Sequence, residues 1–170
     1  MKKTPHNPPP SPNSGSPDPA ASYRPGVGIV LFNKDGRVLI AERIGSAGAW
    51  QMPQGGIDAG EAPEIAVFRE MEEEIGTRNA AIIGMMEDWI CYDFPTALGK
   101  ELWNGKYRGQ RQKWIALRFL GEDNDIKLNL HTEPEFSQWK WVPLQDLIQY
   151  VVPFKRAVYE RVIQEFKKYS

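Results

Sequence analysis

Apolar and polar residues alternate with two different periods along this chain, and each period predicts a different element. Val27, Ile29 and Leu31 follow a period of two, which is typical of a strand, and the turn residues 33–36 separate them from the apolar run 38–40. The two segments therefore predict a hairpin that begins near Tyr23. Further strand-like runs lie at residues 81–85, 89–94, 113–119 and 139–142.

Helical periodicity is clearest after the glycine-rich segment in the first half of the chain. Pro63 suits the first turn of a helix, and Val67, Met71 and Ile75 then share one stripe before Gly76 ends the run. This pattern predicts a helix from Pro63 to Ile75. Helical segments are also expected at residues 144–150 and 154–169. Strands mixed with a few helices, without an internal repeat, indicate an α/β sandwich.

Composition divides the chain into a tail and one domain. Residues 1–22 are rich in Pro, Ser and Asn and have little to bury, which predicts a disordered tail, and residues 23–170 are predicted to form the single domain. A net charge of −1 does not give the basic footprint of a duplex DNA binder. The sequence has no apolar run long enough to span a membrane. The single cysteine, Cys91, is expected in the core of a cytoplasmic protein.

Glutamates crowd the second half of the predicted helix. Glu70, Glu73 and Glu74 are related by i, i+3 and i+4, so their carboxylates share one face and repel each other near the helix end that disfavours negative charge. A hard divalent cation such as Mg²⁺ would remove this conflict, because it prefers carboxylate and water oxygens and bridges to phosphates. The alternative is a solvated acidic face.

The surrounding residues make the cation hypothesis more specific. Gly55, Glu61, Arg69, the glutamates and Gly76 are spaced as in the Nudix box, and the segment from Gly55 to Thr77 resembles that motif. Thr77 is a departure, because the family usually has an aliphatic residue there. The resemblance implies an α/β/α sandwich with a mixed sheet, in which the loop, helix and loop of the box hold one to three Mg²⁺ or Mn²⁺ ions.

The same resemblance implies roles for the charged residues. Glu70, Glu73 and Glu74 would be metal ligands and catalytic residues, with Glu73 preferred over Glu70 as the base that deprotonates water. Arg69 would orient a carboxylate. Glu135, in Pro134-Glu135-Phe136, would add a further metal ligand, and its alternative role is a loop charge.

Within the superfamily, the chain resembles bacterial RNA pyrophosphohydrolases and asymmetric dinucleoside-polyphosphate hydrolases most closely. The similarity rests on segments 23–30, 50–57, 109–114, 134–136, 139–141 and 152–156. It implies that Phe154 stacks on the terminal base, with a core position as the alternative. The residues implied to contact the polyphosphate, each of which could instead be a surface residue, are Arg24, Arg43, Gln54, Lys113 and Lys155.

The expected function is therefore metal-dependent removal of pyrophosphate from 5′-triphosphorylated RNA, leaving a 5′-monophosphate. Three alternatives are hydrolysis of diadenosine tetraphosphate and related dinucleotides, hydrolysis of damaged nucleoside triphosphates, and a binding module without catalysis. RNA and dinucleotide substrates present a nucleoside with a long polyphosphate to the same residues, so the sequence does not separate them.

Overall fold

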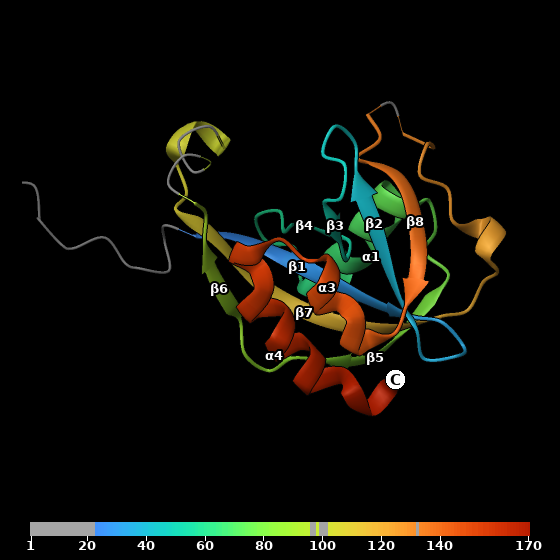
Figure 1. Ribbon diagram of the computed structural model, residues 1–170. Coiled ribbons are helices and arrows are strands. Elements are labelled where there is room, and N and C mark those ends of the chain that lie inside the picture. The colour runs from blue at the N-terminus through green and yellow to red at the C-terminus, as the bar shows by residue number, and fades with distance from the viewer. Residues whose placement is uncertain (1–22, 96–97, 99–101, 132) are drawn as a thin grey trace, which may run out of the picture.

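The computed structural model describes residues 23–95, 98, 102–131 and 133–170, so the tail predicted at residues 1–22 lies outside the described residues (Figure 1). The strands are β1 (Tyr23–Phe32), β2 (Val38–Arg43), β3 (Trp50–Gln51), β4 (Gln54–Gly56), β5 (Ala80–Met85), β6 (Ile90–Asp93), β7 (Gly109–Phe119) and β8 (Phe136–Val142). The helices are α1 (Pro63–Ile75), α3 (Leu147–Tyr150) and α4 (Arg156–Phe166). Short 3₁₀ turns occur at Leu102–Gly105, Asp123–Asp125, Leu144–Asp146, Pro153–Lys155 and Lys167–Tyr169.

The sheet is mixed, and β1 lies at its centre. β1 runs parallel to β7, with Tyr23 opposite Gly109 at one end and Phe32 opposite Arg118 at the other. It pairs antiparallel with β2 and β4. β5 and β6 add antiparallel to β7, whereas β3 and β8 add antiparallel to β2. The parallel pair requires a long crossover between β1 and β7, and α1 lies within that crossover.

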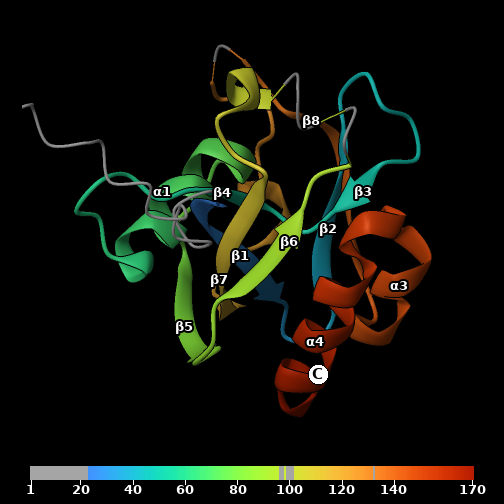
Figure 2. The same ribbon diagram turned by 90° about the vertical axis from the view of Figure 1, so that its left-hand side faces the viewer.

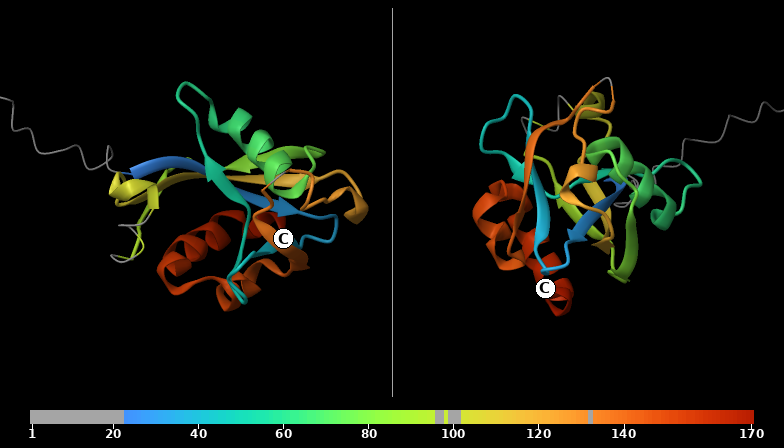
Figure 3. Two further views of the ribbon diagram at one scale, coloured as in Figure 1. Left: turned by 90° about the horizontal axis from the view of Figure 1, so that it is seen from above. Right: turned by 90° about the vertical axis from the view of Figure 1, so that its right-hand side faces the viewer.

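Helices cover both faces of the sheet (Figures 2 and 3). Successive strand residues point to opposite faces. Ile29 and Leu31 of β1 therefore pack in the cluster that includes α1, whereas Val30 and Phe32 pack in the cluster that includes α4. Burial on both faces explains why β1 is apolar nearly throughout, and it confirms the predicted α/β/α sandwich.

The boundaries differ from prediction where neighbouring strands decide them. The helix from Pro63 to Ile75 is confirmed. β7 begins at Gly109 rather than at residue 113, because its first residues pair with β6. The core position expected for Cys91 was wrong, since Ile90 and Tyr92 point inward and alternation turns the thiol outward. No helix in the described ranges is long and apolar enough to cross a membrane.

A buried hydrogen bond connects the C-terminal helix to the glycine-rich loop at residues 52–56. The hydroxyl of Tyr159, on α4, accepts a hydrogen bond from the backbone N–H of Met52 at 2.8 Å. Both residues are fully buried. This bond fixes the segment that leads into β4, which forms one wall of the site described next.

Candidate active site

Arg69 joins the loop before α1 to the helix itself. Its guanidinium donates to both carboxylate oxygens of Glu61, at 2.7 and 2.8 Å, and to the carbonyl oxygen of Gly56 at 2.8 Å. It also donates to Glu70 at 2.9 Å. The hydrogen bonds from Arg69 lower the pKa of the Glu61 carboxyl to about 2. Arg69 thus lies beside the carboxylate that it was predicted to orient, and it holds loop and helix in one arrangement.

The backbone of β4 lies directly against the carboxylates of α1. A Cβ atom built on Gly55 would overlap the side-chain carboxyl group of Glu70, so a larger residue there would displace this carboxylate. One residue earlier, the N–H of Gln54 donates to Glu74 at 3.0 Å. The glycine therefore permits a close approach that places Glu70 and Glu74 on one wall of a pocket.

The glutamates of α1 occupy different environments. Glu74 is buried, and its pKa is raised well above the ordinary value, first by burial and then by the nearby charges of Glu135 and Glu70. Burial also raises the pKa of Glu70 to about 7, although the hydrogen bond from Arg69 opposes this shift. The side chain of Glu73 is half exposed, with an oxygen 3.5 Å from Arg69. Two carboxyl groups are thus held where ionisation is unfavourable in the protein alone.

The chemistry of these donors fits a hard divalent cation. Within the described ranges, no three His, Cys, Asp or Glu side chains are gathered tightly enough to form a ready-made metal cluster. Glu70, Glu74 and Glu135 nevertheless line the same pocket, and the charge of Glu135 adds to burial in raising the pKa of Glu70 and of Glu74, which is the conflict that a cation relieves. These residues therefore suit Mg²⁺ or Mn²⁺.

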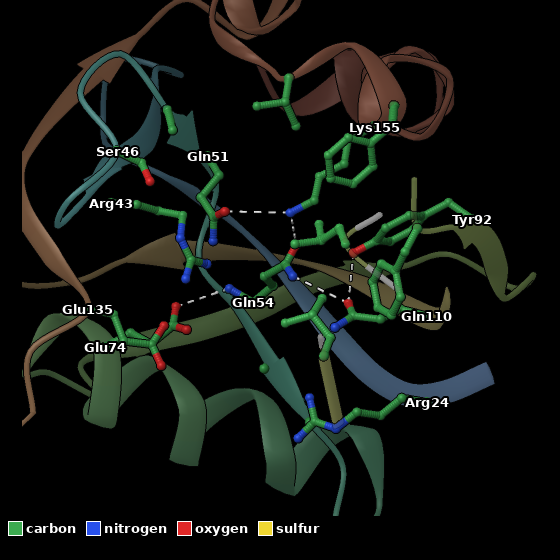
Figure 4. Close-up of a pocket in the computed structure, with 18 of the residues that line it drawn as sticks. Arg24, Arg43, Ser46, Gln51, Gln54, Glu74, Tyr92, Gln110, Glu135 and Lys155 are labelled. Atoms are coloured by element: carbon green, nitrogen blue, oxygen red, sulfur yellow. Dashed lines mark hydrogen bonds between the residues drawn. The ribbon is translucent and has the colours of Figure 1, made fainter. Parts of the chain in front are cut away.

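Cations face the carboxylates across a pocket of about 610 Å³. Figure 4 shows Lys155 and Arg24 on opposite sides of it, with Arg43 beside Glu74 and Glu135. Lys155 is 8% exposed and donates to the side-chain oxygens of Gln54 and Gln51, at 3.2 and 3.5 Å. Burial, assisted by the charge of Arg43, lowers the pKa of Lys155 to about 8.

These cations have few partners within the protein. Among the described residues, no carboxylate lies within 4.0 Å of the charged atoms of Arg24, Arg43 or Lys155. Arg69 and Arg108, by contrast, are paired. A pocket with one acidic wall and several unneutralised cations is suited to a metal-bound polyphosphate.

A buried network of amides, not predicted from the sequence, sets the floor of the pocket. The side-chain oxygen of Gln110 accepts hydrogen bonds from Tyr92 at 2.9 Å, Gln112 at 3.0 Å and Gln54 at 3.3 Å. Gln110 and Gln112 occupy alternate positions of β7 and so share a face. Polar residues two apart in a strand with buried faces are the signal that could have identified this network.

Aromatic rings line the remaining walls. Phe154, predicted to stack on a base, lies 6.1 Å from Tyr92 between ring centroids. Trp103 stacks on Phe94 at 5.5 Å, and the guanidinium of Arg24 lies 4.6 Å from its centroid. Tyr92 and Trp103 were not among the predicted site residues. Trp103, which lines the pocket, has a left-handed backbone conformation (φ 48°) that is uncommon for a bulky residue.

Lys113 is the predicted polyphosphate ligand that the structure does not bring to the pocket. Alternation along β7 turns it to the face opposite Gln112, where its Nζ donates to the carbonyl oxygen of Glu87. Lys113 thus lies outside the pocket in this structure, and its contact with the polyphosphate stays a prediction. All the other predicted site residues except Arg69 line the pocket: Arg24, Arg43, Gln54, Glu70, Glu73, Glu74, Glu135, Phe154 and Lys155.

Comparison with known proteins gives a consistent match over most of the chain. The model of the NUDIX domain matches residues 22–162. The RNA pyrophosphohydrolase of Rhodospirillum rubrum is 55% identical over 148 residues, which cover 87% of this chain and 89% of that protein. The RNA pyrophosphohydrolase of Rickettsia typhi is 48% identical over 147 residues, covering 85% and 90%.

Solved structures show the same fold at low sequence identity. The E. coli dihydroneopterin triphosphate pyrophosphohydrolase superposes with a TM-score of 0.63 at 17% identity, covering 84% of this chain and 98% of that one. A C. elegans Ap4A hydrolase gives 0.58 at 18% identity, also covering 84% and 98%. At these identities the similarity supports the fold alone.

Proposed function

This chain belongs to the NUDIX domain family, and we propose that it removes pyrophosphate from the 5′-triphosphate end of RNA, leaving a 5′-monophosphate. The observation that carries this proposal is one pocket with several carboxylates on one wall and unneutralised cations on the others. The names of the similar proteins from R. rubrum and R. typhi support RNA as the substrate. The cytoplasmic location expected from the sequence stays a prediction.

We infer that the cations and Phe154 hold the substrate. The 5′ base would stack on Phe154, since stacking accepts any base and leaves the enzyme tolerant of sequence. Lys155 and Arg43 would neutralise the phosphates nearest this base, and Arg24 would contact the far end of the triphosphate. Gln54 would set the position of Lys155 through their hydrogen bond.

Hydrolysis then requires an activated water. Glu70, Glu74 and Glu135 would hold the divalent cation, which lowers the pKa of bound water and offsets phosphate charge when present. Glu73, the more exposed carboxylate of α1, would accept the proton of the attacking water. The oxygen of that water forms a new bond to phosphorus as the anhydride bond between the α and β phosphates breaks. Arg24 and Arg43 would stabilise the charge on the departing pyrophosphate.

The carboxylates argue against a binding module without catalysis. Glu70 and Glu74 are held against their ordinary ionisation, an arrangement that recognition of a nucleotide does not need. Hydrolysis of a dinucleoside polyphosphate uses the same residues and is the nearest alternative. Hydrolysis of damaged nucleoside triphosphates fits less well, because the similar proteins from R. rubrum and R. typhi are named RNA pyrophosphohydrolase.

A competition assay tests the substrate assignment. A short 5′-triphosphate RNA and diadenosine tetraphosphate are supplied together with Mg²⁺, and kcat/KM is compared because that ratio sets discrimination. We expect RNA to be preferred, and Glu73→Gln to lose activity by orders of magnitude while it stays folded. Preference for the dinucleotide would make that substrate primary. If neither substrate is cleaved, the result favours a binding module without catalysis.

A further inference from the structure

A second pocket adjoins the first and has no role in the proposed reaction. It has a volume of about 470 Å³ and is bounded on one side by the loop that precedes α1. Arg24 lines both pockets. Gly56 lies in the wall of the first and the adjacent Ile57 in the wall of the second, so the two spaces meet around one guanidinium.

The chemistry of the second pocket is aromatic and cationic. The guanidinium of Arg111 lies 4.4 Å from the ring centroid of Trp89, and both residues line the pocket together with Tyr107. Arg111 has no carboxylate within 4.0 Å among the described residues. Trp89 is only partly buried, so part of its ring is accessible. An indole beside a planar guanidinium is a stacking platform for a nucleobase.

The position of this platform indicates which base it would take. In the proposed reaction the 5′ base lies at Phe154 and the polyphosphate extends toward Arg24, on the opposite side of the first pocket (Figure 4). A group attached to the far end of that polyphosphate would pass Arg24 and enter the second pocket. The body of an RNA would not reach it by this route, because it leaves from the nucleoside held at Phe154.

We propose that the second pocket binds the distal nucleoside of a dinucleoside polyphosphate, with its base on the Trp89–Arg111 pair and Arg24 on the phosphates between the two sites. This inference rests on the proposed function, since it takes the placement of the first base from it. Trp103 is a weaker platform for the distal base, because the ring of Phe94 already stacks on it, whereas the contacts of the Trp89 ring are with the cations Arg111 and Lys113, at 4.4 and 5.7 Å. The exposed carboxylate of Asp58 adds a hydrogen-bond acceptor for ribose hydroxyls or an exocyclic amine.

Binding of two matched probes tests this proposal. One is a methylene-bridged, non-hydrolysable analogue of diadenosine tetraphosphate, and the other is the corresponding adenosine tetraphosphate, which lacks the second nucleoside. Calorimetric titration of each probe into the protein, in the presence of Mg²⁺, gives the ratio of their dissociation constants. We expect Trp89→Ala to shift this ratio roughly five- to a hundredfold against the two-nucleoside probe, which is the usual effect of removing a stacking aromatic. Affinity for the one-nucleoside probe should not change.

Control variants separate stacking from a general loss of structure. Trp89→Phe keeps an aromatic platform and should retain most of the preference for the two-nucleoside probe. Arg111→Ala should weaken that preference, as Trp89→Ala does. Arg78→Ala removes an exposed arginine that pairs with Glu72 outside both pockets, and it should leave the ratio unchanged.

The outcomes also separate this inference from the proposed function. An unchanged ratio in Trp89→Ala, with both probes still bound, overturns the second subsite and leaves the RNA reaction intact. Failure to bind either probe overturns both. A shifted ratio in a protein that does not cleave RNA supports the subsite and makes dinucleotides the substrate.

Discussion

Two glutamates in this site lie where the metal-free protein disfavours their ionised form. Glu70 and Glu74 lie one helical turn apart, pressed against β4, and burial raises the pKa of both. Glu61, only a short distance along the chain, has its pKa lowered to about 2 because Arg69 donates to both of its oxygens. The same type of side chain is thus stabilised as an anion in one place and destabilised in the other.

The metal-free protein should lose stability as pH rises through the range in which Glu70 ionises. The pKa of Glu70 is raised from 4.5 to about 7, so the folded state binds more protons than the unfolded state between these values. The stabilisation is complete below pH 4.5 and is lost by about pH 7, an effect of roughly 3 kcal/mol at most. Glu74 contributes with the same sign.

Urea unfolding from pH 5 to 8 in the presence of a chelator measures this dependence. The Glu70→Gln variant is the control, because its amide does not titrate and the slope should become shallower. Added Mg²⁺ should also flatten the curve of the wild-type protein, since a cation replaces the protons. An identical slope in wild type and Glu70→Gln would show that burial of Glu70 is not its cause.

At the scale of elements, local signals were predictable and pairings between strands were not. Pro63 and Gly76 mark the ends of α1 in the sequence itself, and the left-handed conformation of Gly76 confirms the stop. The side of the sheet that Lys113 and Gln110 face depends on where β7 pairs with β1 and β6, and a shift of one residue reverses it. The outward position of Lys113 and the role of Gln110 as a hydrogen-bonding centre therefore could not be derived from the sequence.

The contact between α4 and the glycine-rich loop yields a prediction for element packing. Tyr159→Phe leaves the buried N–H of Met52 without an acceptor, which should lower the free energy of unfolding by roughly 1–3 kcal/mol. Tyr150→Phe is the matched control, since its hydroxyl makes no hydrogen bond within the described part of the chain. Urea unfolding of both variants measures the free energy of unfolding. Equal decreases in the two variants would mean that the hydrogen bond to Met52 does not stabilise the fold.

At the scale of the whole molecule, the fold assembles the pocket from segments far apart in sequence. Arg24 comes from β1, Glu74 from α1, Glu135 from the residue before β8 and Lys155 from the turn before α4. The sequence identified these residues through a resemblance, but only the fold shows that the acidic wall is partly buried. Charge repulsion within this wall destabilises the metal-free protein. The Glu74 carboxylate should therefore lower the stability of the metal-free protein while it strengthens the binding of the metal.

Mg²⁺ should therefore stabilise the entire fold by mass action. A ligand that binds only the folded state adds about 2.7 kcal/mol at one hundred times its dissociation constant, so Tm should rise with the logarithm of Mg²⁺ concentration. Glu74→Gln removes a buried carboxylate that is disfavoured in the metal-free protein. This variant should melt higher than wild type in a chelator, yet gain little from Mg²⁺ and lose activity.

Glu72→Gln supplies the control on the same helix. Glu72 is half exposed, pairs with Arg78 and does not line the pocket, so this variant should keep the full response to Mg²⁺. Thermal melts of the three proteins across a Mg²⁺ series measure the effect directly. If Glu74→Gln responded to Mg²⁺ as strongly as Glu72→Gln, Glu74 would not be a metal ligand, and its burial would need a structural reason instead.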